Sequence, residues 1–222
     1  MSLPLENETV AAMIPRLRAA VAEWRTPLVD AMAATGSDPF RILIATIISL
    51  RTKDDVTAVV APRLFALADT PRAMLQLRPE QIEAAIYPAG FYRTKARTIL
   101  EVSRLLLDEY GGRVPDEIAE LLTLPGVGRK TANLVVTAGY GKPGICVDTH
   151  VHRITNRWGY VNTKTPEQTE MALREKLPPE HWLEINGLLV SLGQNICHPT
   201  SPRCSICPVA AECRRVGVTR SR

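Results

Sequence analysis

The spacing of its apolar residues limits this chain to one fold class. Along most of the 222 residues they recur at the three- to four-residue interval of a helix, and Gly and Pro separate one such segment from the next. No run alternates apolar and polar residues for long enough to form the strands of a sheet. The sequence therefore predicts an all-α protein, with helices near 9–33, 38–50, 54–68, 71–76, 79–86, 92–110, 116–123, 128–139, 149–158, 166–176 and 180–196.

The longest apolar run, residues 42–50, predicts the buried centre of one core and is far too short to span a bilayer. The first eight residues carry two glutamates where a signal peptide needs basic residues, so export is not expected. The densest Gly/Pro cluster, at 139–144, is expected to separate two lobes.

The positive charge of the chain is concentrated at its C-terminal end. The net charge is +4, and residues 203–222 hold five arginines and one glutamate. A basic end on a nearly neutral body favours a polyanion as partner, with an ordinary solvated tail as the alternative.

Four of the five cysteines, Cys197, Cys204, Cys207 and Cys213, form the pattern C-x6-C-x2-C-x5-C, whereas the first 145 residues contain none. Disulfides are disfavoured because nothing indicates an oxidising compartment. Structural zinc sites usually combine two close cysteine pairs, whereas the long arms here suit a wider [4Fe–4S] cluster. The spacing favours the cluster and leaves zinc as the alternative, while Cys146 is expected to be a small buried residue.

The sequence Pro-Gly-Val-Gly at 125–128 joins two predicted helices. Its two glycines permit positive φ angles and a close approach of the backbone to a ligand. They precede a helix N-terminus, where unpaired N–H groups and the helix dipole favour an anion such as phosphate. With Arg-Lys-Thr directly after them, phosphate binding is favoured over a plain turn between helices.

Lys130 and Asp148 are the candidate catalytic groups. Lys130 falls in the first turn of a helix, where the dipole disfavours an ammonium ion and favours a nucleophilic amine; a simple contact with phosphate is the alternative. Asp148 is predicted to be an N-cap whose carboxylate is held ionised by backbone N–H groups. The helix 128–139 would rise about 18 Å. The segment 141–147 spans at most about 23 Å, so the chain can return Asp148 toward Lys130, although capping alone also explains Asp148.

Three motifs together resemble the endonuclease III family, which comprises base-excision DNA glycosylases and lyases of the helix-hairpin-helix superfamily. They are Leu-Pro-Gly-Val-Gly-Arg-Lys-Thr-Ala-Asn at 124–133, Val-Asp-Thr-His-Val-His-Arg at 147–153, and the cysteine pattern. The resemblance runs from about residue 38 to 213. It implies a two-lobed all-α fold: a six-helix barrel with the helix-hairpin-helix at 32–142, and an iron–sulfur lobe from 1–31 and 143–222. DNA would lie in the cleft between them.

The resemblance also implies a base-excision repair enzyme that removes oxidised pyrimidines from damaged double-stranded DNA and cleaves 3′ to the abasic site by β-elimination. Lys130 would form a Schiff base, Asp148 would stabilise positive charge on the sugar, and the four cysteines would hold one structural [4Fe–4S] cluster per chain. The expected DNA contacts are Arg51, Phe91, Leu124, Gly126, Val127, Gly128, Arg129, Thr131, His150, Arg153, His198 and Arg203. A cytoplasmic monomer is expected, nucleoid-associated in a bacterium and without a membrane partner.

One position departs from the family pattern. Arg51 stands where the family commonly has Gln, and arginine is longer, cationic and unable to accept a hydrogen bond. The range of lesions and the opposite-base preference therefore stay open. A paralogue for another lesion, such as thymine in a G·T mismatch, and a non-catalytic damaged-DNA-binding module are the alternatives. Lys130 argues against the adenine glycosylase relatives, which lack this lysine.

Overall fold

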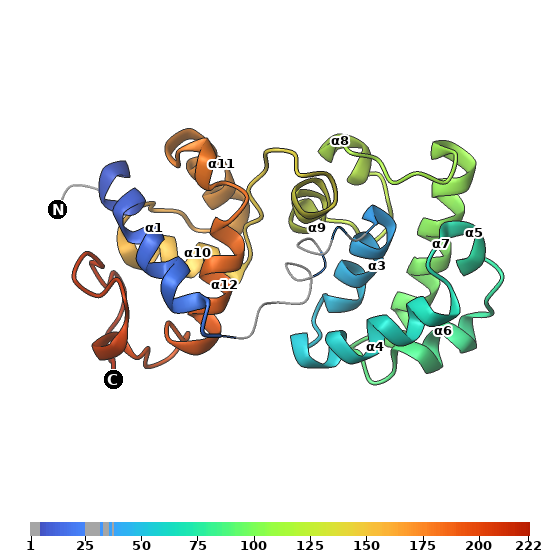
Figure 1. Ribbon diagram of the computed structural model, residues 1–222, viewed down its shortest axis with the longest axis horizontal. Helices are drawn as coiled ribbons and strands as arrows, with labels where there is room; N and C mark the ends of the chain where they lie inside the picture. The colour runs from blue at the N-terminus through green and yellow to red at the C-terminus, as the bar shows by residue number, and fades with distance from the viewer. Residues whose placement is uncertain (1–4, 25–31, 33–35, 37) are drawn as a thin grey trace. The chain divides into compact units, whose positions relative to one another are not determined.

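The computed structural model describes residues 5–24, 32, 36 and 38–222, and every regular element within them is helical, which confirms the all-α prediction. None of the described helices has the length and apolar character needed to cross a membrane. The elements (Figure 1) are α1 (Asn7–Val21), α3 (Pro39–Ser49), α4 (Asp54–Leu67), α5 (Pro71–Met74), α6 (Pro79–Ile86), α7 (Tyr92–Tyr110), α8 (Ile118–Leu121), α9 (Arg129–Leu134), the π-helix η1 (Val135–Gly139), α10 (Thr149–Trp158), α11 (Pro166–Lys176), the 3-10 turn η2 (Pro179–His181), α12 (Ile185–Asn195) and the 3-10 turn η3 (Cys204–Ile206).

The chain divides into two compact units. Unit 1 comprises Met1–Pro27 and Pro143–Arg222, and unit 2 comprises Leu28–Lys142. The division falls inside the Gly/Pro-rich stretch 139–144, where Gly141 adopts a φ of 62°.

Helix α3 is the centre of unit 2. Its N-cap Asp38 accepts a hydrogen bond from the Phe40 N–H at 2.8 Å, and Pro39 occupies the first turn, where its missing N–H costs nothing. Residues 42–48 are all buried, as predicted for the apolar run. Around α3 pack α4, α7, α9 and η1, and α6 covers α4 and α7 (Figure 1).

Helix α9 and its continuation η1 pack against α3. A Cβ on Gly139, the last residue of η1, would lie 3.4 Å from Pro39, the first residue of α3, so these two termini are neighbours. The helix predicted at 128–139 is an α-helix up to Leu134 and a π-helix over its last five residues, Val135–Gly139.

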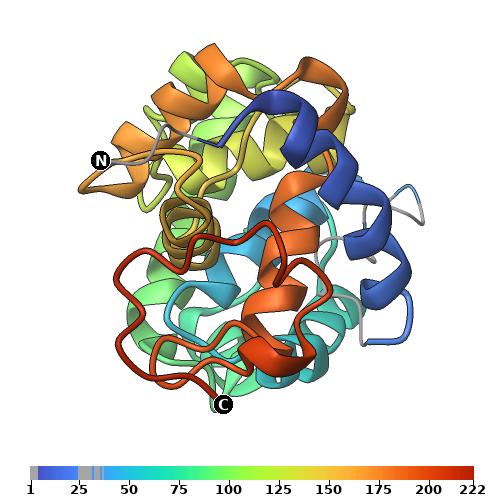
Figure 2. The same ribbon diagram turned by 90° about the vertical axis from the view of Figure 1, so that its left-hand side faces the viewer.

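Unit 1 is built on α1, α10 and α12, whose apolar faces share one core. Met13 and Leu17 of α1, Ile154 and Trp158 of α10, and Leu189 of α12 are among its buried side chains. Figures 1 and 2 both show α1 beside α12. Helix α11 packs against α10.

Two predicted helices were too long. The first, 9–33, ends at Val21, because the N–H groups of Glu23 and Trp24 bond to carbonyls three residues back and form turns; residues 25–31 and 33–35 lie outside the described residues. The last, 180–196, is η2 followed by α12 from Ile185. Its first residues are held as a turn by the bond from Trp182 Nε1 to the Leu177 carbonyl. The predicted helices at 71–76 and 116–123 are single turns, α5 and α8.

Candidate DNA-binding and catalytic site

The hairpin between α8 and α9 is anchored by apolar side chains and turned by one glycine. Leu124 and Val127 are buried, and the Val127 N–H donates to the Leu124 carbonyl at 3.2 Å. Gly126 has a φ of 74°, and a Cβ there would lie 2.9 Å from Thr98 Cγ2. Gly128, the N-cap of α9, has an ordinary φ of −97°, and a Cβ on it would meet no atom within 4 Å. Positive φ is therefore needed only at Gly126, while Gly128 leaves space in front of the helix terminus.

Lys130 is the second residue of α9 and is half-exposed, as is Arg129 before it. Thr131 is only 1% exposed, so its side chain faces the interior of unit 2. The side chains of Leu124 and Val127 are buried as well. In this conformation, any DNA contact by these three residues is limited to their backbone atoms.

Arg51 and Phe91, from two separate loops of unit 2, lie against each other. Arg51 follows α3 and Phe91 precedes α7; both side chains are exposed, Phe91 by 61%. The Arg51 guanidinium carbon lies 5.4 Å from the centroid of the Phe91 ring, within the range of a cation–π interaction. Both residues have positive φ, 53° and 58°, which is unusual for residues other than glycine.

Two residues that the sequence analysis did not single out, Lys95 and Thr52, form a hydrogen bond with each other next to Arg51. Lys95 is 6% exposed, and its Nζ donates to the carbonyls of Ile48 and Leu50 and to Thr52 Oγ1. Burial lowers the pKa of Lys95 to about 8. From the sequence, a lysine in the first turn of an amphipathic helix is expected to be exposed to solvent. The hydrogen-bond acceptors of Lys95 are more than forty residues away, so no local sequence pattern identifies its role.

In unit 1, Asp148 caps α10 as predicted. Its Oδ1 accepts hydrogen bonds from the N–H groups of His150 at 2.8 Å and Val151 at 2.9 Å. The carboxyl group is half-buried. These two backbone donors fix the position of the carboxyl group at the start of α10.

The basic side chains of α10 face the cysteine segment. Arg153 donates to the Cys197 carbonyl, with Nη2 at 2.9 Å, and its Nη2 lies 3.0 Å from His150 Nδ1. A Cβ on Gly193 of α12 would lie 2.1 Å from that nitrogen, so only glycine at position 193 leaves room for His150. Burial lowers the pKa of Arg153. His150 and Arg153 are therefore held within unit 1, and neither is a simple exposed contact for phosphate.

The four clustered cysteines line one cavity of unit 1, whose walls include Trp158, Leu192 and Ile196. Burial, with the neighbouring thiols adding to it, raises the pKa of Cys207 to about 11 and also raises the pKa of Cys213. Arg157 Nη1 donates to Cys197 Sγ at 3.3 Å and to the His198 carbonyl at 2.7 Å. Within the described residues these cysteines form no disulfide, and no three His, Cys, Asp or Glu side chains are arranged around a single metal ion.

A four-thiol donor set around one cavity fits a cubane cluster. The last residues of the chain fold back over it: the Arg222 N–H donates to the Pro202 carbonyl and the Val216 N–H to the Arg157 carbonyl. His198 is half-exposed and Arg203 is exposed on the loop between the first two cysteines. Burial and then the charge of Arg203 lower the pKa of His198.

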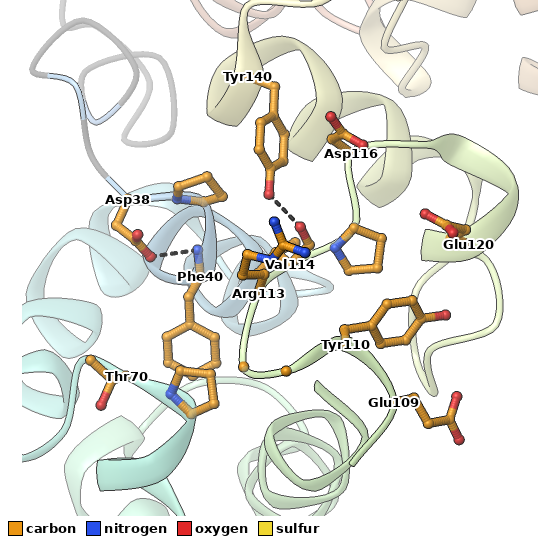
Figure 3. Close-up of a pocket in the computed structure, with 15 residues that line it drawn as sticks. Asp38, Phe40, Thr70, Glu109, Tyr110, Arg113, Val114, Asp116, Glu120 and Tyr140 are labelled. Atoms are coloured by element: carbon orange, nitrogen blue, oxygen red, sulfur yellow. Dashed lines mark hydrogen bonds between the residues drawn. The ribbon is translucent and has the colours of Figure 1, made fainter. Parts of the chain in front are cut away.

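A separate cavity of unit 2, of about 820 Å³, lies where α3 begins and η1 ends (Figure 3). Asp38, Tyr110 and Tyr140 line it, and the Tyr140 hydroxyl donates to the Val114 carbonyl. Lys142 pairs nearby with Asp116 at 2.9 Å and with Glu117. None of the predicted site residues is among the described residues that line this cavity, so it is distinct from the predicted DNA contacts of unit 2.

Comparisons with known proteins found a matching family model, similar sequences and similar structures. The family model described as HhH-GPD superfamily base excision DNA repair protein matches residues 44–179. Endonuclease III of Thermotoga maritima is 50% identical over 177 residues, which are 80% of this chain and 83% of that protein. A trapped covalent intermediate of endonuclease III with DNA (an estranged-adenine complex) is 33% identical with a TM-score of 0.83, covering 95% of this chain and 97% of that one. A non-covalent endonuclease III–DNA complex is also 33% identical, with a TM-score of 0.84 and coverages of 95% and 96%.

Proposed function

The chain belongs to the HhH-GPD superfamily of base excision DNA repair proteins, and on that premise we propose that it is a DNA glycosylase and AP lyase whose attacking amine is Lys130 and whose carboxylate is Asp148. The observation that carries the proposal is the position of Lys130. It is half-exposed in the first turn of α9, directly after a hairpin whose Gly128 leaves open space. A nucleophilic lysine needs an amine that the substrate can reach, and this position provides one.

In the reaction, Lys130 Nζ attacks C1′ of the damaged nucleotide, and the bond from C1′ to the base breaks. The base leaves with the bonding electron pair and takes up a proton. Opening of the sugar ring gives a Schiff base between Lys130 and C1′, which acidifies the hydrogen on C2′. Removal of that proton expels the 3′ phosphate by β-elimination, and water then hydrolyses the Schiff base and releases the lysine.

Asp148 supports the first of these steps as an anion. Positive charge develops on the sugar as the base departs, and a carboxylate stabilises it electrostatically. Both backbone donors bind Oδ1, so we assign the second oxygen, Oδ2, to the sugar and to proton transfer. The N-cap geometry serves this role because it fixes the carboxylate without neutralising it.

Phosphate binding follows from the hairpin. A Cβ on Gly128 would meet no atom within 4 Å, so the backbone that leads into the first turn of α9 is open to a ligand. An anion placed there gains hydrogen bonds and a favourable dipole. The exposed arginines among residues 203–222 add positive charge in unit 1, as a polyanion partner requires.

The proposed substrate is double-stranded DNA with an oxidised pyrimidine or an abasic site. A glycosylase must first take the damaged base out of the stack. Arg51 and Phe91 are the exposed pair that we assign to the gap this leaves. A panel of duplexes with one lesion each, cut by wild type and by Arg51→Gln, tests this assignment. A change in opposite-base preference is expected, and an identical profile would remove Arg51 from that role.

Cys197, Cys204, Cys207 and Cys213 are the proposed ligands of one [4Fe–4S] cluster per chain. Bound there, the cluster would be structural, cross-linking the segment 197–213 by four iron–sulfur bonds. Arg157 and Arg153 hold the same segment through Cys197, so the basic face of α10 and the proposed cluster loop form one rigid part.

Trapping with borohydride tests the amine. Wild type should form a covalent adduct with an abasic duplex, because borohydride reduces the Schiff base, and Lys130→Ala should not. Lys142→Ala is the matched control: Lys142 lies in the same unit beyond the far end of η1, and its surface ion pairs contribute little to stability. Strong trapping by Lys130→Ala would refute the proposal. Binding without trapping or cleavage in wild type would instead indicate a non-catalytic DNA-binding module.

A further inference from the structure

We propose that Lys95 is a positioning residue that holds the Arg51 loop and the Phe91 loop together as a single element for insertion into duplex DNA. This rests on the proposed function, because it takes Arg51 and Phe91 to be the inserted side chains. The assignment of Lys95 itself comes from its contacts with the chain on both sides of this pair.

Lys95 reaches across from the first turn of α7 to the end of α3. Its Nζ donates to the Ile48 carbonyl at 2.6 Å, the Leu50 carbonyl at 2.5 Å and Thr52 Oγ1 at 2.8 Å. These acceptors lie on both sides of Arg51. The carbonyls at the end of a helix have no partner within it, so this ammonium group satisfies the C-terminus of α3 and fixes the chain that leaves it.

Thr52 extends the contact to the second loop. Its Oγ1 accepts the Gly90 N–H at 3.1 Å as well as the Lys95 proton. A Cβ on Gly90 would lie 2.5 Å from the Arg51 carbonyl oxygen, so the two loops touch through their backbones at a point where only glycine fits. Phe91 follows directly, and its ring then lies under the Arg51 guanidinium.

The ammonium group of Lys95 is suited to holding the two loops together. An ammonium group has three protons and here meets three acceptors, and no other common side chain supplies three donors from one atom. Lys95 is 6% exposed, and its three hydrogen bonds offset part of the free-energy cost of taking the charge out of water. The helix alone has no need of a lysine at this position.

Each of the two loops that Lys95 joins contains a residue in a strained backbone conformation. Arg51 and Phe91 both have positive φ, a conformation that persists in non-glycine residues only when surrounding contacts impose it. Held in this way, the two side chains stand exposed and already paired, so insertion does not have to order them first. Only duplex DNA, which has a stack and an opposite base, needs such an insertion. A single strand does not.

The experiment compares two substrates. Single-turnover excision of an oxidised pyrimidine from a duplex reports on insertion, and cleavage of an abasic site in a single-stranded oligonucleotide reports on the amine chemistry alone. Lys95→Met should lower duplex excision by about 100-fold, because small displacements of positioning groups cost this much. Single-strand cleavage should stay within about threefold. The effect of Lys95→Met should largely vanish in a protein that also carries Arg51→Ala and Phe91→Ala.

Thr52 supplies the variant that keeps the test decisive if Lys95→Met does not fold. Thr52→Val removes the shared hydroxyl and the two hydrogen bonds that it accepts, with little change of shape, and should lower duplex excision by about tenfold, whereas Thr52→Ser should retain it. Equal losses on both substrates, no loss on the duplex, or an undiminished effect without Arg51 and Phe91 would each overturn the proposal. Lys130→Ala separates the two claims: it must abolish cleavage of both substrates, and if it does not, the proposed function fails whatever Lys95 does.

Discussion

Replacing each glycine of the hairpin by alanine should separate folding from DNA binding. Gly126 and Gly128 are two residues apart, yet their surroundings differ. At Gly126 the φ of 74° strains any L residue, and a new methyl group would lie 2.9 Å from Thr98 Cγ2. At Gly128 the backbone suits alanine, and the methyl group would point into open space.

The expected magnitudes follow from these two environments. An L residue in the left-handed region costs about 1 to 2 kcal/mol, and the contact with Thr98 adds to it, so Gly126→Ala should lower the free energy of unfolding by about 2 kcal/mol. Gly128→Ala replaces a tolerated N-cap residue with a poor one, which lowers the free energy of unfolding. Alanine also reduces the conformational entropy of the unfolded chain, which raises the free energy of unfolding. These terms oppose each other, so its stability should stay within about 0.5 kcal/mol of wild type.

The DNA affinities should show the reverse order. If phosphate approaches the backbone at Gly128, an added methyl group displaces it, and the Kd for a duplex with an uncleavable abasic analogue should rise about tenfold, a loss of about 1.4 kcal/mol. Urea denaturation gives the stabilities and fluorescence anisotropy gives the Kd. Wild-type affinity in a folded Gly128→Ala protein would refute phosphate binding at this terminus, and wild-type stability in Gly126→Ala would refute the argument from φ.

Three other outcomes are expected. If four phosphates are neutralised, raising the salt from 50 to 200 mM should weaken DNA binding by about 100-fold, and a flat response would contradict a polyanion partner. Anaerobically purified protein should be brown with about four irons per chain, and Cys207→Ser should lose iron and stability; colourless, active, zinc-containing protein would exclude the cluster. The folded pKa of Lys95, about 8, lies below the usual 10.5, so between these values the unfolded chain binds more protons and the free energy of unfolding should rise with pH, by up to about 1.4 kcal/mol per unit. Subtracting the pH profile of Lys95→Met isolates this rise, and identical profiles would refute it.

Local patterns carried the sequence-based predictions that hold. The apolar spacing predicted the buried helix at 42–48, and Asp148 was predicted to be the N-cap of α10, because both features depend on residues within one or two turns of each other. The four cysteines stand within one short segment, and that segment folds around a single cavity. The hairpin is likewise local, so its position between two helices could be predicted, although not the different conformations of Gly126 and Gly128.

Contacts between segments that are distant in the sequence were determined only by the tertiary structure. Lys95 finds its acceptors 43 to 47 residues away, and His150 fits against α12 only because position 193 is glycine. Thr131 follows the hairpin in sequence, but packing turns its side chain into the core. Helical periodicity fixes which residues can share a face, since it is set by the backbone over a few residues. Which of those faces meet is set by the packing of elements far apart in the chain, and no short stretch of sequence records it.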